Sequence, residues 1–551
     1  MNLYVKNHNF HFELENLTRL FFPNEKITVI RDFSEPQPPY IYTEVSDKIT
    51  ISVNIGSFNK SETAVKKLTD DDNELVSAQL LYKLLCDFTG LTQPWGILTG
   101  VRPVKLLRRL AEESSEEQAV KKFEKDFFVS NEKIALSRET EHNERKILEL
   151  SKPESFSLYV GIPFCPSRCS YCSFVMASIE RAKKLIEPYT KLLCEEIKQT
   201  AEIANKLGLR LETVYFGGGT PTTLSAEQLD TVLRTVNKSF DMSTCREFTV
   251  EAGRPDTIDI AKLFALKENK VDRISINPQT VNDEVLKTIG RKHTAQQFFD
   301  AFELARKCGF DNINTDLIAG LPTDTPESFK NSLDSIVRLN AECITVHTLC
   351  MKRASRLTTE GVTLDLQQAR DAREMLAYTQ NILGQNEYIP YYMYRQSRMV
   401  GNLENVGWSK KGFESLWGDG KNGNEIKPGY ASYSAYVVAE NADEYQDTFE
   451  KETEGNPEYS QISFYVSNLD KQMRDEKSLF TLLGVFAYGL IVVIALIGIT
   501  NIINTLSTGM ELRSREFATL RSIGMTDKQF VGMVRLCLLY TSPSPRDGLL
   551  S

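Results

Sequence analysis

The chain has 551 residues, which is too long for one ordinary domain and predicts roughly three or four. With 41% hydrophobic and 25% charged residues, its composition is typical of folded globular proteins and excludes a disordered or fibrous chain. The formal net charge of −9 gives no overall attraction to nucleic-acid phosphates, so we expect no nucleic-acid partner and expect local basic residues to bind any anionic ligand.

Residues 1–150 are predicted to form a small α/β domain. Alternating apolar residues over Ile41–Val53 indicate strands, and the periodicity of Glu74–Phe88 and Val101–Glu112 indicates helices. The second helix carries a basic group, which is either a solvated helix face or a docking patch for an acidic substrate. This group consists of Arg102, Lys105, Arg108 and Arg109.

Residues 151–412 are predicted to form a second domain. Up to about residue 386, short β-rich runs alternate with amphipathic helices, a pattern typical of repeated βα units and a parallel sheet. The predicted strands are Ser157–Gly161, Thr213–Phe216, Glu247–Glu251, Arg273–Ile276, Asn312–Ile318 and Ile344–Leu349. Strands that are each followed by a helix predict an open or partial barrel. In such folds ligands bind at the carboxyl ends of the strands, where the unusual residues of this sequence also fall.

The motif with the clearest chemistry follows the first of these strands. Residues 161–174, GIPFCPSRCSYCSF, hold Cys165, Cys169 and Cys172 in a C-x3-C-x2-C spacing. Three thiolates on one loop can bind three irons of a cubane cluster and leave the fourth iron open for chemistry. A zinc site would need a fourth ligand at short spacing, and ten cysteines are too sparse in this chain for a disulfide framework. We therefore predict a 4Fe-4S cluster in a reducing, cytoplasmic setting.

This cysteine loop resembles that of the radical S-adenosylmethionine superfamily, in which it follows the first strand of a partial (β/α)6 barrel. Residues 216–222, FGGGTPT, resemble the glycine motif of the superfamily, where bare backbone approaches the cofactor. Alone, this turn would be an ordinary strand-to-helix connection with Thr222 or Ser225 as the N-cap. The predicted fold is thus an α/β radical S-adenosylmethionine barrel preceded by a small α/β domain.

Further motifs resemble the oxygen-independent coproporphyrinogen III oxidase family, and most closely its HemZ type. They are WGILTGVRPVK (95–105), FTVEAGRPDTI (248–258), RISINPQT (273–280), GRKHT (290–294), NINTDLIAGLP (312–322), HTLCMKRASRL (347–357) and YYMYRQSRMVGNLENVG (391–407). The resemblance covers about residues 1–412, or three quarters of the chain.

The resemblance implies which residues contact the cofactor. Those around the cluster-bound S-adenosylmethionine are Tyr159, Gly218, Gly219, Thr220 and Glu251. Positions that line this cofactor or a second S-adenosylmethionine molecule are Tyr171, Gln279, Arg291 and Asp316. As alternatives, Arg291 pairs with a helix carboxylate and Asp316 caps the next loop. His293 and His347 are either core or loop histidines or substrate contacts.

The chemistry implied by the resemblance is the oxidative decarboxylation of coproporphyrinogen III. Reductive cleavage of S-adenosylmethionine gives a 5'-deoxyadenosyl radical that takes hydrogen from a propionate, and loss of carbon dioxide leaves a vinyl group. A flavodoxin or ferredoxin is implied as the electron donor. The carboxylates of the porphyrinogen substrate need cationic partners, for which the candidates are Arg353, Arg356, Arg395 and Arg398.

A haem chaperone is the second interpretation of the barrel. Phe174 stands where the well-characterised dehydrogenase has another cysteine, and the related haem chaperones also carry an aliphatic or aromatic residue there. Against this interpretation, the His-Asn-x-x-Tyr-Trp haem motif of the chaperones does not occur in the sequence.

The sequence changes character after residue 412. Residues 478–510 contain no charged side chain, a length sufficient to cross a bilayer as a helix, and a stretch rich in Arg follows. This part resembles an FtsX-like permease subunit of an ABC transporter, which is a third interpretation and the only predicted membrane contact. Its predicted parts are an extracytoplasmic fragment (413–477), a transmembrane helix (478–504) and a cytoplasmic coupling segment (505–536).

We expect the chain to be an assembly chimera with its joint between Val406 and Ser415. Residues 413–477 would reach the membrane helix from the cytoplasm, although the basic stretch after that helix also requires the cytoplasmic side. One span cannot place both flanks on the same face. Residues 537–551, CLLYTSPSPRDGLLS, resemble translated sequencing-adapter read-through, and the expected C-terminal continuation of the HemZ type is lacking.

Overall fold

The computed structural model describes residues 1–416 except 34, 101, 175, 176, 353, 364, 365 and 397, together with residues 526, 528, 529, 531 and 532. The chain divides into two compact units, residues 1–432 and 433–551, of which the first holds the barrel. The predicted transmembrane helix (478–504), the adapter-like tail (537–551) and Arg353 lie outside the described residues. Within the described part of the chain, no helix is both long and apolar enough to cross a membrane.

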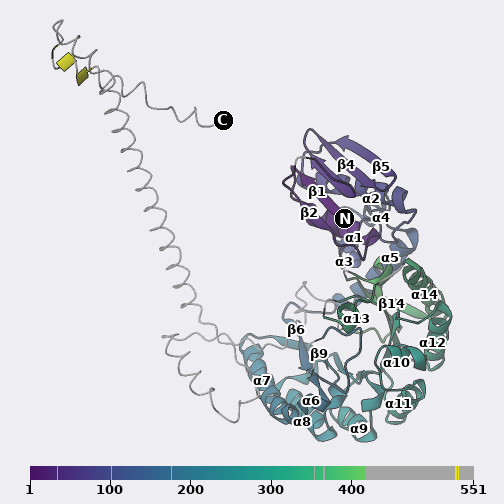
Figure 1. The fold of residues 1–551 in the computed structure, drawn as a ribbon. Helices are drawn as coiled ribbons and strands as arrows, with labels where there is room; N and C mark the ends of the chain where they lie inside the picture. Colours follow the sequence, from purple (N-terminus) through teal and green to yellow (C-terminus); the bar gives the residue numbers. More distant parts are fainter. Residues whose placement is uncertain are drawn as a thin grey trace. The chain divides into compact units, whose positions relative to one another are not determined.

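An N-terminal sheet of five strands has the order β2-β1-β3-β4-β5 (Figure 1). Its strands are β1 Asn2–Lys6, β2 Thr28–Ile30, β3 Tyr40–Val45, β4 Lys48–Ile55 and β5 Phe58–Val65, and its helices are α1 His11–Phe21 and α2 Asp70–Thr89. Burial alternates along β3 and β4, because successive side chains point to opposite faces of a sheet. The inward residues of both strands pack with Leu14, Leu17 and Leu81 of the helices.

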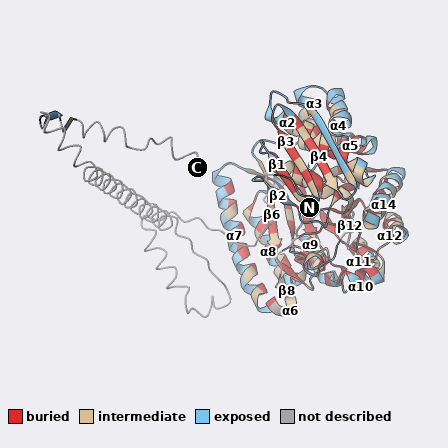
Figure 2. Ribbon diagram, turned by 45° about the horizontal axis from the view of Figure 1, so that its top comes forward, coloured by how far each residue is buried: buried red, intermediate tan, exposed pale blue. Residues whose placement is uncertain are grey.

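The second sheet is the predicted partial barrel, and all of its predicted strands are present. They run parallel in the order β13-β12-β11-β10-β9-β6. Their bounds are β6 Ser155–Ile162, β9 Arg210–Gly218, β10 Glu247–Glu251, β11 Arg273–Ser275, β12 Ile313–Ala319 and β13 Cys343–Thr348. The principal helices after these strands are α7 Ile186–Lys206, α8 Ala226–Ser239, α9 Ile260–Glu268, α11 Ala295–Lys307, α12 Pro326–Arg338 and α14 Leu366–Gln385. In Figure 2 the central strands of this sheet are buried and the outer faces of the helices are exposed, as in a (β/α)6 barrel, whereas the edge strand β6 is partly exposed.

Two antiparallel strands that the sequence pattern did not predict extend this sheet beyond β13. They are β15 Asn405–Lys410, which pairs with β13, and the edge strand β14 Tyr388–Tyr394, which pairs with β15. Short elements complete the described part: β7 Phe164–Cys165, β8 Ala177–Ser178, α6 Ile179–Ala182, α10 Asp283–Thr288 and α13 Arg356–Thr359.

Three further helices, α3 Pro103–Glu113, α4 Glu116–Lys125 and α5 Asn131–Leu148, belong to the barrel core rather than to the N-terminal core. Asn143 Nδ2 of α5 donates to the Pro390 carbonyl of β14 at 3.0 Å. Trp95 Nε1 and Lys133 Nζ both donate to the buried Glu404 carboxylate, at 2.8 and 2.6 Å. We therefore propose a domain boundary near residue 93 instead of residue 150.

The basic group on α3 is partly structural. Arg108 forms ion pairs with Glu141 and Glu144 of α5 at 3.1 and 2.5 Å, which ties the two helices together. Arg109 is exposed and pairs only loosely with Glu113 at 3.8 Å. The group is therefore split between a helix contact and a solvated face, and a docking role for it stays untested.

Candidate functional site

The cysteine loop is closed into a ring at the carboxyl end of β6. Its two ends pair as β7 and β8, with Cys165 opposite Ser178, and Ser170 N donates to the Ile289 carbonyl at 2.9 Å. Cys165 and Cys169 are buried and Cys172 is half-buried. Burial raises the pKa of the Cys165 thiol to about 11 and also raises that of Cys172. Bound iron or nearby cations are therefore needed to hold these groups as thiolates.

The glycine motif contacts the residues that lead from β6 into this loop. Gly219 N donates to the Ile162 carbonyl at 2.7 Å, and Thr220 N donates to the Phe164 carbonyl at 2.8 Å. A Cβ on Gly219 would stand 2.5 Å from the Phe164 oxygen, and Gly218 has φ +100°, so larger residues cannot adopt this turn without strain. The predicted cap is also present, since Ser225 forms a capping box at the start of α8.

Inside the barrel, the Glu251 carboxylate lies beside Tyr215 and Tyr159 and close to Gly217. Tyr215 OH donates to Glu251 Oε1 at 2.5 Å, and the Tyr159 ring stacks on the Tyr215 ring at 6.0 Å between centroids. A Cβ on Gly217 would lie 2.8 Å from the Tyr215 ring and 3.3 Å from Glu251 Oε1. Burial raises the pKa of Glu251 to about 7, while the Tyr215 hydrogen bond opposes that rise. Tyr215 was missed from the sequence, although it lies two residues before Gly217 and therefore on the same face of β9.

Asp316 and His347 lie on neighbouring strands of the same interior. His347 Nε2 is 3.6 Å from Asp316 Oδ2, and Asn314 Nδ2 donates to Asp316 Oδ1 at 2.7 Å. Asp316 belongs to β12 itself, so the alternative that it caps a loop is wrong. The nearby Glu251 is also influenced by the Asp316 and His347 charges, which places these groups in one electrostatic cluster.

Arg291 contacts Tyr171 of the cysteine loop, and Gln279 pairs with β12 beside Asp316. Arg291 donates to Tyr171 OH at 3.1 Å and to the Asn277 carbonyl at 2.5 Å, so its partners are not helix carboxylates. Gln279 has φ +70°, a strained conformation for a side-chain-bearing residue. Among the described residues, neither Arg291 Nε nor Gln279 Oε1 has a hydrogen-bond partner, although both atoms are buried. Such orphaned polar atoms fit a site that receives a polar ligand.

His293 and His347 differ in their surroundings. His293 is only 2% exposed, and burial lowers its pKa to about 3, so it is an uncharged core residue. His347 is half-buried on β13 and faces Asp316, as described above. Of the two, His347 is therefore the more exposed side chain and the better candidate for a substrate contact.

The arginines predicted to bind substrate carboxylates differ in their exposure and in their partners. Arg395 is 2% exposed, donates to the Leu98 carbonyl at 2.9 Å and lies 5.1 Å from the centre of the Trp95 ring. Its prediction as a substrate contact is wrong, because its guanidinium binds backbone inside the protein. Arg356 is exposed and pairs with Glu360 at 2.7 Å. Arg398 is exposed with φ +65°, and its carbonyl accepts from Met351 N beyond β13.

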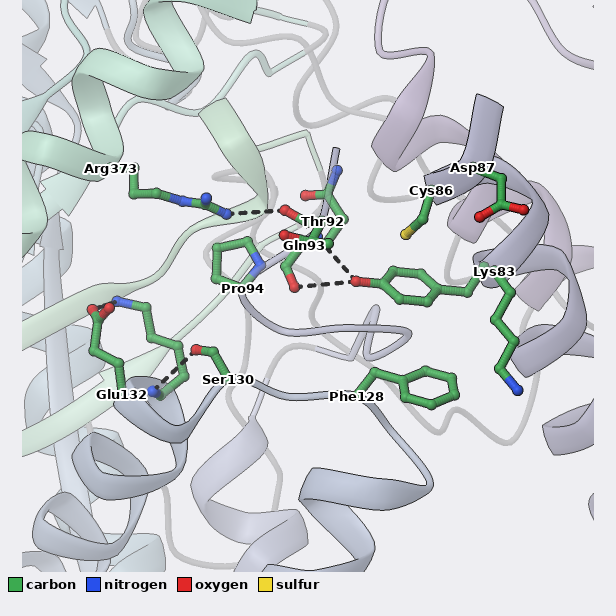
Figure 3. Close-up of a pocket in the computed structure, with 12 residues that line it drawn as sticks. Lys83, Cys86, Asp87, Thr92, Gln93, Pro94, Phe128, Ser130, Glu132 and Arg373 are labelled. Atoms are coloured by element: carbon green, nitrogen blue, oxygen red, sulfur yellow. Dashed lines mark hydrogen bonds and ion pairs between the residues drawn. The ribbon is translucent and has the colours of Figure 1, made fainter. Parts of the chain in front are cut away.

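A separate cavity of about 460 Å³ lies between α2, the loop 92–94, the start of α5 and Arg373 of α14 (Figure 3). Tyr82 OH accepts from Gln93 N at 3.0 Å, and Arg373 Nη2 donates to the Thr92 carbonyl at 3.1 Å. None of the residues that line it comes from the cysteine loop or the barrel strands. We therefore separate this cavity from the candidate site.

The residues at the site fit a cluster together with S-adenosylmethionine. In the described part of the chain, no three His, Cys, Asp or Glu side chains are arranged to hold a single metal ion. A cubane instead binds each cysteine through a different iron, so its thiolates surround a volume and do not meet at one point. The three cysteines, the glycine turn that a Cβ would fill and the orphaned Gln279 oxygen supply such an arrangement.

Comparisons with known proteins find two family matches and several relatives. The radical SAM superfamily matches residues 159–336, and the FtsX-like permease C-terminal family matches residues 488–539. The chain is 36% identical over 422 residues to the oxygen-independent coproporphyrinogen-III oxidase-like protein HemZ of Bacillus subtilis, which covers 74% of this chain and 84% of that protein. It is 35% identical over 300 residues to the heme chaperone HemW of Lactococcus lactis, covering 53% and 73%. The crystal structure of the coproporphyrinogen III oxidase HemN from Escherichia coli aligns with a TM-score of 0.40 and 25% identity, covering 48% of this chain and 58% of that one.

Proposed function

Because the chain belongs to the radical S-adenosylmethionine superfamily, among the HemZ- and HemN-like coproporphyrinogen oxidase homologues, we propose that it decarboxylates coproporphyrinogen III propionates to vinyl groups. The observation that carries this proposal is the ring of Cys165, Cys169 and Cys172 closed over the glycine turn at the carboxyl end of the barrel. The reaction would belong to porphyrin biosynthesis and take place in the cytoplasm. A flavodoxin or ferredoxin is proposed to deliver the electron.

Residues of this chain have distinct proposed roles. The three cysteines would hold the cluster, and the glycine turn with Thr220 would receive the methionine part of S-adenosylmethionine. When bound, the cluster and S-adenosylmethionine would supply a 5'-deoxyadenosyl radical, formed with one electron from the donor, that removes one hydrogen atom from the propionate. The propionate would then lose carbon dioxide and one electron, the electron going to a one-electron acceptor, to leave the vinyl group. Glu251 Oε1 already accepts from Tyr215, so we assign its other oxygen to a ribose hydroxyl. Arg291, Gln279, Tyr171 and Asp316 are proposed to line this cofactor or a second molecule of it.

The substrate carboxylates are assigned to the exposed cations near the end of β13. Arg356 and Arg398 remain candidates, and the strained backbone of Arg398 supports a functional reason for its position. Arg353 stays a candidate from the sequence alone. Guanidinium groups suit this task, because they bind carboxylates through two parallel hydrogen bonds.

Anaerobic turnover tests the proposed reaction. The full chain, reconstituted with iron and sulfide and reduced, is expected to form 5'-deoxyadenosine, and coproporphyrinogen III is expected to be converted to a divinyl product with release of carbon dioxide. A Cys169→Ala variant serves as the control without a cluster and should form neither product. Absence of S-adenosylmethionine cleavage in the reconstituted wild type would refute the proposal.

Haem binding is the second candidate function. Phe174, in the position that distinguishes the dehydrogenase from the chaperones, is 47% exposed beside the cysteine loop, and the HemW relative is covered over 73% of its length. A stable Soret band after mixing with haem, without conversion of coproporphyrinogen III, would favour this function. Conversion of the substrate would favour the first.

A further inference from the structure

Arg254 is a buried arginine that contacts the cysteine loop from the neighbouring strand. It follows β10, three residues after Glu251, and only 3% of it is exposed. Its Nη1 donates to Cys169 Sγ at 3.7 Å, and both Nη atoms donate to Ser167 Oγ at 3.2 Å. The guanidinium therefore contacts a predicted cluster ligand directly and also holds the loop that carries it.

Asp256 fixes the direction of this guanidinium. Arg254 Nε and Nη2 donate to the two Asp256 oxygens at 3.0 Å each, a bidentate pair that leaves Nη1 directed at the loop. Burial tends to raise the pKa of Asp256, but its hydrogen bonds and attraction to Arg254 outweigh burial and lower it. Asp256 is therefore held in its ionised form, and its negative charge offsets part of the positive charge of the Arg254 guanidinium.

Two other ionisable side chains lie near Cys169 or Arg254. Arg291 adds a second positive charge beside Cys169, and His293 adds no charge. The Arg291 guanidinium also interacts with the Cys169 thiol, so this cysteine faces two buried cations. His293 lies close to Arg254, Arg291 and Asp256, but its pKa of about 3 leaves it uncharged under ordinary conditions. Among these groups, the Arg254–Asp256 pair supplies both a positive and a negative charge that single substitutions can remove separately.

We propose that Arg254 is a positioning residue that raises the reduction potential of the cluster through its charge and its N–H···S contact at Cys169, with Asp256 opposing it. Reduction adds negative charge to the cluster, and a cation beside a ligand sulfur stabilises the reduced state more than the oxidised state. The low dielectric of a buried site enlarges this difference. The inference rests on the proposed function only through the cluster, not through the porphyrinogen reaction.

The test is an anaerobic redox titration of the reconstituted full chain, followed by electron paramagnetic resonance without porphyrinogen or S-adenosylmethionine. Arg254→Gln is expected to lower the midpoint potential, Arg254→Lys to lower it less, and Asp256→Asn to raise it. Arg234→Gln is the matched control, because it removes an equal charge from an exposed pair with Asp230 on α8 and should leave the potential unchanged. Iron content per chain is measured for every variant.

Opposite shifts for Arg254→Gln and Asp256→Asn support the inference, because a merely loosened loop would move both potentials in the same direction. Shifts of the same sign, or no shift in either variant with iron retained, overturn it. If Arg254→Gln cannot hold iron, the signs found for Arg254→Lys and Asp256→Asn decide. A wild type without any cluster would instead contradict the proposed function.

Discussion

At the scale of single residues, opposing interactions decide whether the Glu251 carboxyl group is ionised. Burial and the nearby Asp316 disfavour its ionised form, whereas the hydroxyl of Tyr215 stabilises that form through the hydrogen bond at 2.5 Å. Burial raises the pKa of Tyr215 well above its ordinary value, so this hydroxyl keeps its proton and acts as a donor. Tyr215 therefore keeps Glu251 available as an acceptor near neutral pH.

Replacing Tyr215 with Phe is expected to weaken S-adenosylmethionine binding by about tenfold or more, since a hydrogen bond to a charged group contributes about 1.5–3 kcal/mol. Because the ribose needs the ionised acceptor, wild-type affinity should fall as the pH drops through the Glu251 pKa of about 7. In the variant this fall should begin at a higher pH. Calorimetric titration at several pH values measures both effects. Tyr378→Phe, which removes a similar bond to Asp334 on the outer helices, should change neither.

The cysteines give a second prediction at this scale. Changing Cys165, Cys169 or Cys172 singly to Ala removes one iron ligand and should abolish the absorbance and bound iron of the cluster. The same change at Cys86, Cys194, Cys245 or Cys308 should leave both intact, because none of these residues belongs to the cysteine loop. Equal loss of iron in the two groups would contradict the assignment.

At the scale of elements, the contact between the glycine turn and the cysteine loop decides the geometry of the site. Replacing Gly219 with Ala forces a Cβ to within 2.5 Å of the Phe164 oxygen, so the loop must move. Overpacking of this kind costs about 1–3 kcal/mol, and we expect a lower melting temperature together with reduced iron content. Gly384→Ala in α14 is the control, because its Cβ would meet no atom within 4 Å and should stabilise the helix. Full iron content in the Gly219 variant would show that the turn does not set the loop.

The elements also show how far sequence patterns reach. The parallel strands were predictable because they are short runs that hold β-branched or aromatic residues between turns, as Phe248, Thr249 and Val250 of β10 illustrate. Strand β14 was missed, since Pro390 and a register shift beside it interrupt the strand pattern. Arg254 was missed because its partner Cys169 lies 85 residues away in the sequence, a distance that no local pattern spans. The same limit explains Arg395, whose burial against the Leu98 carbonyl depends on a contact 297 residues away.

At the scale of the whole molecule, the contacts of residues 413–416 help to locate the joint between the two sequence families. Ser415 Oγ and Leu416 N donate to the two oxygens of Glu247, at 2.7 and 2.6 Å. Arg273, the first residue of β11, donates through Nη1 to the Phe413 carbonyl at 3.3 Å. These contacts attach residues 413–416 to the bottom of the barrel, beyond the predicted boundary at residue 412.

We therefore propose that the joint lies downstream of these contacts, between Leu416 and the start of the FtsX-like match at residue 488, and not in the predicted interval from Val406 to Ser415. Residues before it contact barrel groups, and the FtsX-like match begins at residue 488 in a segment that resembles a membrane family. A genuine fusion would bring residues 417–477 to the predicted membrane helix from the cytoplasm, although the basic stretch predicted to follow that helix also favours the cytoplasmic side. Long-read sequencing of the source DNA across codons 416–488 is expected to find the two reading frames on separate molecules. A single unbroken read with an intact frame through this interval would show that the chain is a true fusion.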